Sequence, residues 1–277
     1  MEEMFGIKYA RPEVVLLQES GIGVAEMAAR TCYDSFSHSE NDVVKALEST
    51  LPDAKMCESL NNIKESQLLD DLAWTYFHHS ILEHANLSYL IRGTSRGVLQ
   101  EHARHRIQAI SVRSTRYTMS SLINAFVASK QGGDREFFIE KVLAFDMFVT
   151  ADEAYNRIEI GGMYEKLDFQ AKQVEDFYTL AVTKSSLAFL EELQGKPQEL
   201  YDALEAGKKK RNVGDAFKHI ITDNVKVDMV VTFNLRSLKN YFTLRDSGAA
   251  YFQIRWLAQE MIKATPQKYL DLIIKKK

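Results

Sequence analysis

Four arginines stand close together in a stretch of the chain that contains no acidic residue. Between Glu101 and Asp134 there is no Asp or Glu, although the whole chain carries a net charge of −3. A guanidinium group binds phosphate or carboxylate through two parallel hydrogen bonds, so such a cluster is typical of an anion site. Capping of a helix C-terminus by basic residues is the ordinary alternative, but it would explain only the first part of the cluster. The four residues are Arg104, Arg106, Arg113 and Arg116.

The same arginines belong to a motif with a fixed spacing. Arg104-His105-Arg106 is followed, after residues 107–113, by Ser114. Three more short motifs stand in order along the chain: Glu83-His84, Ser114-Thr115-Arg116-Tyr117, and the segment 234–240, Asn-Leu-Arg-Ser-Leu-Lys-Asn, which continues to Leu244-Arg245. Together these motifs, spread over most of the chain, resemble those of the flavin-dependent thymidylate synthases.

This resemblance implies the reductive methylation of dUMP to dTMP. In that family the one-carbon unit comes from methylenetetrahydrofolate, and the hydride comes from FAD that NADPH has reduced. The flavin performs the redox chemistry, so the protein contributes positioning and electrostatics. The resemblance also implies a homotetramer whose active sites are shared between subunits. No Gly-x-Gly-x-x-Gly turn follows a predicted strand, which agrees with an FAD site on a scaffold other than a Rossmann fold.

The resemblance further assigns roles to individual residues. Negative charge develops on the uracil carbonyls when carbon 5 becomes nucleophilic, and a guanidinium placed there stabilises that charge. Arg245 matches the family residue in this catalytic role, although by position alone it could be an ordinary helix-end cation. Ser114 is assigned with Arg245 to the reacting site, where its hydroxyl binds dUMP. The other positions that match substrate contacts are Glu101, Arg104, Thr115, Arg116 and Lys218, and those that match FAD contacts are His84, Arg104, His105, Arg106, Asn234, Arg236 and Asn240.

The chain departs from the family pattern at a few substrate-side positions. Val112 stands where many members have Glu, and Lys218 stands where many have Arg, which binds in a bidentate fork that Lys cannot form. Ala249 and Tyr251 occupy a stretch where some members have His and Gln. These departures leave open a flavin enzyme of the same fold that acts on another pyrimidine nucleotide. A non-enzymatic nucleic-acid-binding protein is a second alternative, but the net negative charge and the small basic cluster disfavour it.

The elements that must position these residues follow from hydrophobic periodicity. The first part of the cluster, Arg104–Arg106, is predicted to end a helix that starts at an N-cap, Thr94. Past residue 109 the pattern alternates, so an extended run should reach Ser114 and Arg116 and place both on one face. Further strands are expected over 14–17, 85–91 (opened by Glu83-His84) and 228–233. Further helices are expected over 24–33, 41–50, 55–77, 134–157, 163–193, 234–245 and 251–264, with Leu68, Leu69, Leu72, Ala73 and Tyr76 as core positions of the third.

These elements predict an α+β fold, in which an antiparallel sheet is flanked by long helices and a helical segment is added. We expect one catalytic domain over residues 1–277, with the added segment (about 134–213) packed on it. A content of 45% hydrophobic residues agrees with a globular core. No apolar run is long enough to span a bilayer, so no membrane partner is expected.

Cysteines and histidines give little sign of a metal or disulfide site. Cys32 and Cys57 are the only cysteines, and both are interpreted as structural residues within helices rather than as nucleophiles. The spacing of His78, His79 and His84 does not suit one metal ion, so no metal site is predicted. The acidic N-terminus does not resemble a signal peptide, and the cytoplasm is the expected location.

Overall fold

The computed structural model describes residues 2–4, 7–9, 11–64, 66–118, 223 and 226–275. The predicted helical segment over about 134–213 and the candidate residue Lys218 lie outside these residues. The chain divides into two compact units. The first unit holds Met1–Arg11, Gly93–Gln100 and Val112–Asp228, and the second holds Pro12–Arg92, Glu101–Ser111 and Met229–Lys277. The expectation of a single domain over residues 1–277 stays a prediction.

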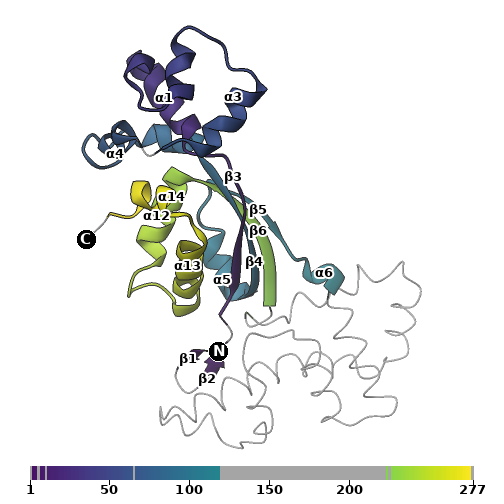
Figure 1. The fold of residues 1–277 in the computed structure, drawn as a ribbon. Coiled ribbons are helices and arrows are strands. Elements are labelled where there is room, and N and C mark those ends of the chain that lie inside the picture. The colour runs from purple at the N-terminus through teal and green to yellow at the C-terminus, as the bar shows by residue number, and fades with distance from the viewer. Residues whose placement is uncertain are drawn as a thin grey trace, which may run out of the picture. The chain divides into compact units, whose positions relative to one another are not determined.

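The centre of the described fold is a four-stranded sheet of order β3-β4-β6-β5 (Figure 1). Strands β3 and β4 are antiparallel, with Val14 opposite Ile91. In β4 and β6 buried residues alternate with more exposed ones, as expected when one face of a sheet is covered. The predicted strands and the α+β class with an antiparallel sheet are confirmed. The strand bounds are β3 Glu13–Glu19, β4 Asn86–Ser95, β5 Ala109–Val112 and β6 Lys226–Asn234.

Three C-terminal helices of the second unit cover one side of this sheet: α12 (Leu235–Arg245), α13 (Phe252–Ala264) and α14 (Gln267–Ile273) (Figure 1). Helix α13 contacts β3, and α12 contacts both α13 and α14. Trp256 is buried in this layer, and the buried Tyr89 hydroxyl pairs with Thr265 Oγ1 at 2.7 Å. The predicted helices over 234–245 and 251–264 are confirmed. Pro266 stands at the N-cap of α14, a helix that sequence analysis did not predict.

Short helices of the second unit gather beyond one end of the strands (Figure 1). Helix α1 confirms the prediction over 24–33, but the single helix expected over 55–77 is wrong. The Asp53 carboxylate accepts a hydrogen bond from the Met56 N–H (2.8 Å) and starts α3, which ends at Ser59, and α4 begins at Gln67. The bounds are α1 Gly23–Tyr33, η1 Phe36–His38, α2 Asp42–Lys45, η2 Ala46–Glu48, α3 Ala54–Ser59, η3 Leu60–Asn62, α4 Gln67–Trp74 and η4 His79–His84.

Helix α4 contributes core residues as expected, with one exception. Leu69, Leu72 and Ala73 are buried, but Tyr76 is 61% exposed. The helix ends at Trp74, before Tyr76, and the chain then turns through a positive φ of 56° at Phe77. Tyr76 therefore does not follow the helical period that placed it in the core.

The helix before the arginine cluster is shorter than predicted. Thr94 is not its N-cap but a residue of β4, and the Ser95 hydroxyl accepts the Val98 N–H (3.2 Å) at the start of α5 (Arg96–His102). At the other end, the Gln108 amide donates to the carbonyls of His102 (3.0 Å) and His105 (2.8 Å). Because this side chain pairs with the end of the helix, the chain leaves the helical path before Arg104 instead of after Arg106.

Two further local predictions are corrected. The extended run does not continue through Arg116, because Thr115–Thr118 form the short helix α6, so Ser114 and Arg116 are not two positions on one face of a strand. Glu83 and His84 close the 3-10 helix η4 and do not open β4.

The first unit also contains a small hairpin and contacts of its own. Strands β1 (Glu2–Met4) and β2 (Ile7–Tyr9) pair in antiparallel fashion. Asp228 accepts hydrogen bonds from the Gly93 N–H through its carboxylate (2.9 Å) and from the Arg113 N–H through its carbonyl (2.8 Å).

Cys32 and Cys57 lie in helices as predicted, on α1 and α3, and both are exposed. None of the described helices combines the length and the apolar character that crossing a bilayer requires. Within the described residues, His, Cys, Asp and Glu side chains do not come together in threes as a metal site would need.

Candidate functional site

The junction between β6 and α12 places most of the C-terminal motif. Asn234 is the N-cap of α12, and its side-chain oxygen accepts the Ser237 N–H at 2.8 Å. Leu235, which follows, donates its N–H to the Ala85 carbonyl (2.9 Å). One face of α12 is apolar and fully covered: Leu235, Leu238, Tyr241 and Phe242. The opposite face is therefore free to present Arg236, Lys239, Asn240 and Thr243 to solvent or to a ligand.

A cavity of about 1170 Å³ lies over this second face of α12, and the described residues that line it all belong to the second unit. We call it the cleft. Its volume is slightly above the usual range for small-molecule pockets, which is roughly 300–1,000 Å³, so it has room for a ligand of dinucleotide size. It is lined by His79, Glu83, Arg104, His105, Arg106, Ile107, Arg236, Ser237, Lys239, Asn240, Thr243, Leu244, Arg245, Ser247, Ala249 and Ala250.

The lining of the cleft is strongly positive. Among the described residues that line it, Glu83 is the acidic one and five side chains are cationic. A concave surface that carries one sign of charge concentrates ligands of the opposite sign. The side-chain chemistry therefore suits an anionic ligand. The five cations are Arg104, Arg106, Arg236, Lys239 and Arg245.

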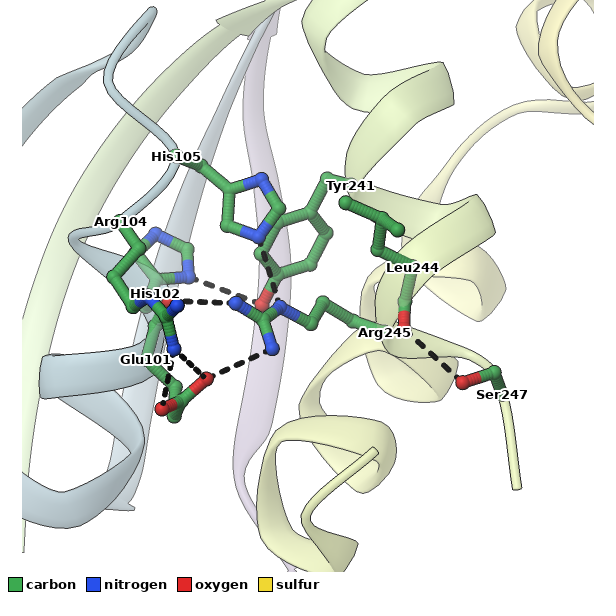
Figure 2. Close-up of polar contacts among 8 residues, drawn as sticks. All are labelled: Glu101, His102, Arg104, His105, Tyr241, Leu244, Arg245 and Ser247. Atoms are coloured by element: carbon green, nitrogen blue, oxygen red, sulfur yellow. Dashed lines mark hydrogen bonds and ion pairs between the residues drawn. The ribbon is translucent and has the colours of Figure 1, made fainter. Parts of the chain in front are cut away.

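Arg245, the last residue of α12, is held from three sides (Figure 2). Its Nη1 donates to Glu101 Oε2 (2.9 Å), its Nη2 donates to the Glu101 carbonyl (3.1 Å), and its Nε donates to His105 Nε2 (2.8 Å). The side chain is only 15% exposed. Arg104, which is 72% exposed, binds the same Glu101 carboxylate at 3.2 Å. Arg245 thus has a fixed orientation, whereas Arg104 lies at the surface.

The electrostatics of this cluster define the charge of each member. Burial alone would raise the pKa of Glu101, but hydrogen bonds and positive charge from Arg104 and Arg245 outweigh it and lower the pKa. Burial, with the nearby charges of Arg245 and Arg104, lowers the pKa of His105. Because His105 Nε2 accepts the Arg245 N–H, the ring is neutral with its proton on Nδ1.

Beneath His105, two buried rings support the cluster. The His105 ring lies edge-on to Tyr241 with centroids 4.7 Å apart, and the Tyr241 hydroxyl pairs with His102 Nδ1 at 3.0 Å. Burial raises the pKa of Tyr241 far above its ordinary value, so the phenol is protonated. Burial lowers the pKa of His102 to about 4, and the charges of His105 and Arg245 act in the same direction. His102 is therefore a neutral, fully buried residue.

Other contacts fix the opposite end of the cleft. Arg236 forms an ion pair with Glu83 on η4 at 2.5 Å, and both side chains are about half exposed. The Lys239 ammonium lies 3.6 Å from the centroid of the Trp74 ring and donates to the Ala73 carbonyl (3.3 Å). Burial lowers the pKa of Lys239. The Lys239 side chain is therefore held against Trp74 and Ala73, whereas the more exposed Arg236 side chain can extend into the cavity.

The structure brings together about half of the candidate residues from the sequence. Glu101 does not line the cleft but binds Arg245, which does. Asn234 uses its side-chain oxygen to cap α12, and His84 is exposed at the end of η4, outside the lining. Ser114, Thr115 and Arg116 belong to the first unit and are not part of the lining. The candidates that line the cleft are Arg104, His105, Arg106, Arg236, Asn240 and Arg245.

Sequence analysis missed several lining residues. Lys239 lies in the C-terminal motif but has no role assigned by the resemblance, and His79 stands out in the sequence only as a candidate metal ligand. Lys239 and Thr243 follow Arg236 at steps of three and four residues, so the helical period of the motif could have indicated them. His79 gave no comparable signal, because only the fold brings η4 beside α12.

Comparisons with known proteins agree with one another. The family model described as "Thymidylate synthase complementing protein" matches residues 15–269. The chain is 27% identical over 257 residues to the flavin-dependent thymidylate synthase of Campylobacter jejuni, covering 93% of each chain. It is 27% identical over 256 residues to that of Wolinella succinogenes, covering 92% of this chain and 94% of the other. A crystal structure of thymidylate synthase X from Helicobacter pylori, described as containing FAD and dUMP, superposes with a TM-score of 0.59 and 25% identity, covering 95% and 97% of the two chains.

Proposed function

Since the chain belongs to the thymidylate synthase complementing protein family, we propose that it is a flavin-dependent thymidylate synthase that methylates dUMP to dTMP. Methylenetetrahydrofolate is the carbon donor, FAD is the cofactor, and NADPH supplies the reducing equivalents. The single observation that carries this proposal beyond family membership is the positively charged cleft, because it gathers six of the candidate site residues around a volume that suits a dinucleotide.

FAD, when bound, supplies the hydride that completes the methyl group. The residues of the cleft fit this cofactor by their chemistry. Arg104, Arg106 and Arg236 are exposed guanidinium groups that can pair with its phosphates, and the exposed Asn240 amide can both donate to and accept from a ring edge. His105, with a proton on Nδ1, can donate one further hydrogen bond. His84 and Asn234 complete the proposed FAD contacts; for Asn234 the amide nitrogen would serve, since its oxygen caps α12.

Arg245 is the residue that we propose to act on the reacting ring. Arg245 lines the cleft, its side chain is mostly buried, and the orientation of its guanidinium is fixed by three hydrogen bonds. A fixed positive charge in a partly desolvated place stabilises negative charge on the uracil carbonyls without reorganising during the reaction. An ordinary helix-end cation, which is the alternative interpretation of Arg245, would need neither this burial nor this fixed orientation.

The remaining substrate contacts are proposed from the motifs. Ser114, Thr115 and Arg116 would hold the phosphate or sugar of dUMP, with Arg104 and Lys218 as further matched positions. We also propose that the enzyme is a homotetramer with shared active sites, that folate and NADPH bind as co-substrates, that it works in the cytoplasm, and that it binds neither nucleic acid nor membrane.

The experiment is a reconstitution with purified protein. The protein should be yellow or bind added FAD, release the flavin on heating or acid treatment, and bleach faster with NADPH when dUMP is present. Tritium release from carbon 5 of dUMP should require FAD, NADPH and methylenetetrahydrofolate together. dCMP and UMP serve as comparison substrates. A colourless protein without FAD affinity, covalently attached flavin, or preferred turnover of dCMP or UMP would contradict the proposal.

A further inference from the structure

The guanidinium of Arg245 has every nitrogen engaged by two residues of the arginine-cluster segment. Glu101 accepts two of its hydrogen bonds, one through the carboxylate and one through the backbone carbonyl, and His105 accepts the third through Nε2. All three distances, 2.8 to 3.1 Å, are those of well-formed hydrogen bonds. An arginine side chain loses much rotamer freedom in such an arrangement. This loss of conformational entropy occurs when the protein folds, before any ligand binds.

Glu101 is poorly placed to bind a nucleotide itself. Its carboxylate does not line the cleft, and it already serves Arg104 as well as Arg245. Its lowered pKa, which arises because the hydrogen bonds and charges of these arginines outweigh burial, keeps it ionised. A negative side chain would also repel a phosphate or a uracil ring on which negative charge develops.

We propose that Glu101 is a positioning residue, which acts on the pyrimidine only through Arg245 by holding the guanidinium in one orientation at the cleft. This inference rests on the proposed function, and it replaces the direct substrate contact that the sequence resemblance implied for Glu101. Neutral His105 helps to fix the same orientation, because its Nε2 accepts a hydrogen bond from Arg245 Nε. The physical gain is preorganisation, because a donor that is already oriented in the free enzyme stabilises developing charge at no further cost.

The test is a double-mutant cycle between Glu101 and Arg245. Dissociation of dUMP, FAD affinity and the kcat and KM of dTMP formation are measured for the parent, Glu101→Ala, Arg245→Ala and the double variant, all as FAD-loaded enzymes. Glu101→Ala should lower kcat by about tenfold to hundredfold, the size expected when a reacting group is misplaced by about 1 Å. FAD affinity should stay within about twofold of the parent, because Glu101 is outside the lining.

The decisive result is the interaction between the two substitutions. If Glu101 acts through Arg245, adding Glu101→Ala to Arg245→Ala should cause no further loss of kcat. Glu101→Gln keeps an acceptor oxygen for Nη1 and leaves the backbone carbonyl in place, so its kcat should lie between those of the parent and Glu101→Ala. If Glu101→Ala fails to fold, the double-mutant cycle is measured with Glu101→Gln instead. Glu260→Gln, which breaks the Glu260–Lys263 ion pair outside the cleft, is the matched control and should retain the parent rate.

Three outcomes would overturn the inference. Losses of kcat that multiply in the double variant would show that Glu101 contacts the substrate or acts elsewhere, and so would a rise in the KM for dUMP with an unchanged kcat. Glu101→Ala with parent kcat would show that Arg245 needs no support. A parent enzyme that makes no dTMP in the complete assay would instead refute the proposed function, so the two failures are distinguishable.

Discussion

A buried histidine should make this protein unusually sensitive to mild acid, and His102 is the residue that we expect to cause it. His102 is fully buried, lies edge-on to Phe233 and Tyr241, and pairs through Nδ1 with the Tyr241 hydroxyl. Burial lowers its pKa to about 4, whereas the unfolded chain has a value near 6.5. Between these two values the unfolded state binds more protons than the folded state. The free energy of unfolding must therefore fall as the pH falls below about 6.5.

The magnitude follows from the two pKa values. Linkage gives a loss of about 2 kcal/mol from this one group at about pH 5, and about 3 kcal/mol at about pH 4. The perturbation that isolates it is His102→Gln, since Gln has no titration in this range and its amide oxygen can still accept the Tyr241 hydroxyl. His102→Gln should be less stable than the parent at neutral pH but should lose about 2 kcal/mol less between about pH 7 and pH 5.

The assay is urea unfolding of the FAD-loaded protein, followed by far-ultraviolet circular dichroism at several pH values. His38→Gln is the matched control, because His38 is exposed and its removal should leave the pH dependence of the parent unchanged. Parallel pH profiles for the parent and His102→Gln would refute the argument, since they would mean that His102 is neither the acid-sensitive group nor kept neutral by burial.

Three further outcomes are expected for the chemistry. Arg245→Ala should lower dTMP formation by about a hundredfold to a thousandfold with little change in FAD affinity, measured by tritium release and flavin titration; near-normal turnover in an intact enzyme would leave Arg245 as only a helix-end cation. The double substitution Cys32→Ala, Cys57→Ala should keep a substantial fraction of the parent rate, because both thiols are exposed and neither lines the cleft; inactive protein that still binds FAD, or a dUMP adduct on either thiol, would contradict this. Ser114→Ala should weaken dUMP binding, measured by calorimetry, yet leave measurable turnover, and a complete loss of rate with normal dUMP binding would indicate covalent catalysis instead.

Local pattern in the sequence was sufficient for the β6–α12 junction. An apolar strand, a residue that caps helices and a helical period follow one another between positions 228 and 245, and each is encoded within a few residues of the place where it acts. Asn234 is the N-cap, as the start of the predicted helix at this residue implied. The same holds for the positions of α1 and β3, although Val15 and Leu17 of β3 are exposed (54% and 53%) despite their apolar side chains. The motifs also identified the family, because their order and spacing are properties of the chain itself.

Local pattern failed where distant or side-chain contacts decide the backbone path. The basic residues Arg104–Arg106 favour a helix C-terminus, but Gln108 pairs with the carbonyls of His102 and His105, so the helix ends earlier. This shift matters for function, since it takes Arg104 and His105 off the helix and leaves Glu101 on its last turn. No propensity of these residues predicts a cap that comes from a side chain beyond the helix.

The pairing of Glu101 with Arg245 is the feature that only the tertiary structure decided. The two residues are 144 positions apart, and each has a satisfactory local interpretation, Glu101 as a surface pair with His105 and Arg245 as a helix-end cation. The sequence by itself determined the family, the strand and helix that carry Arg245, and the arginines of the cleft. It could not assign the partner of Arg245, because an ion pair depends on distance in space. Only the packing of α12 beside the loop after α5 sets that distance.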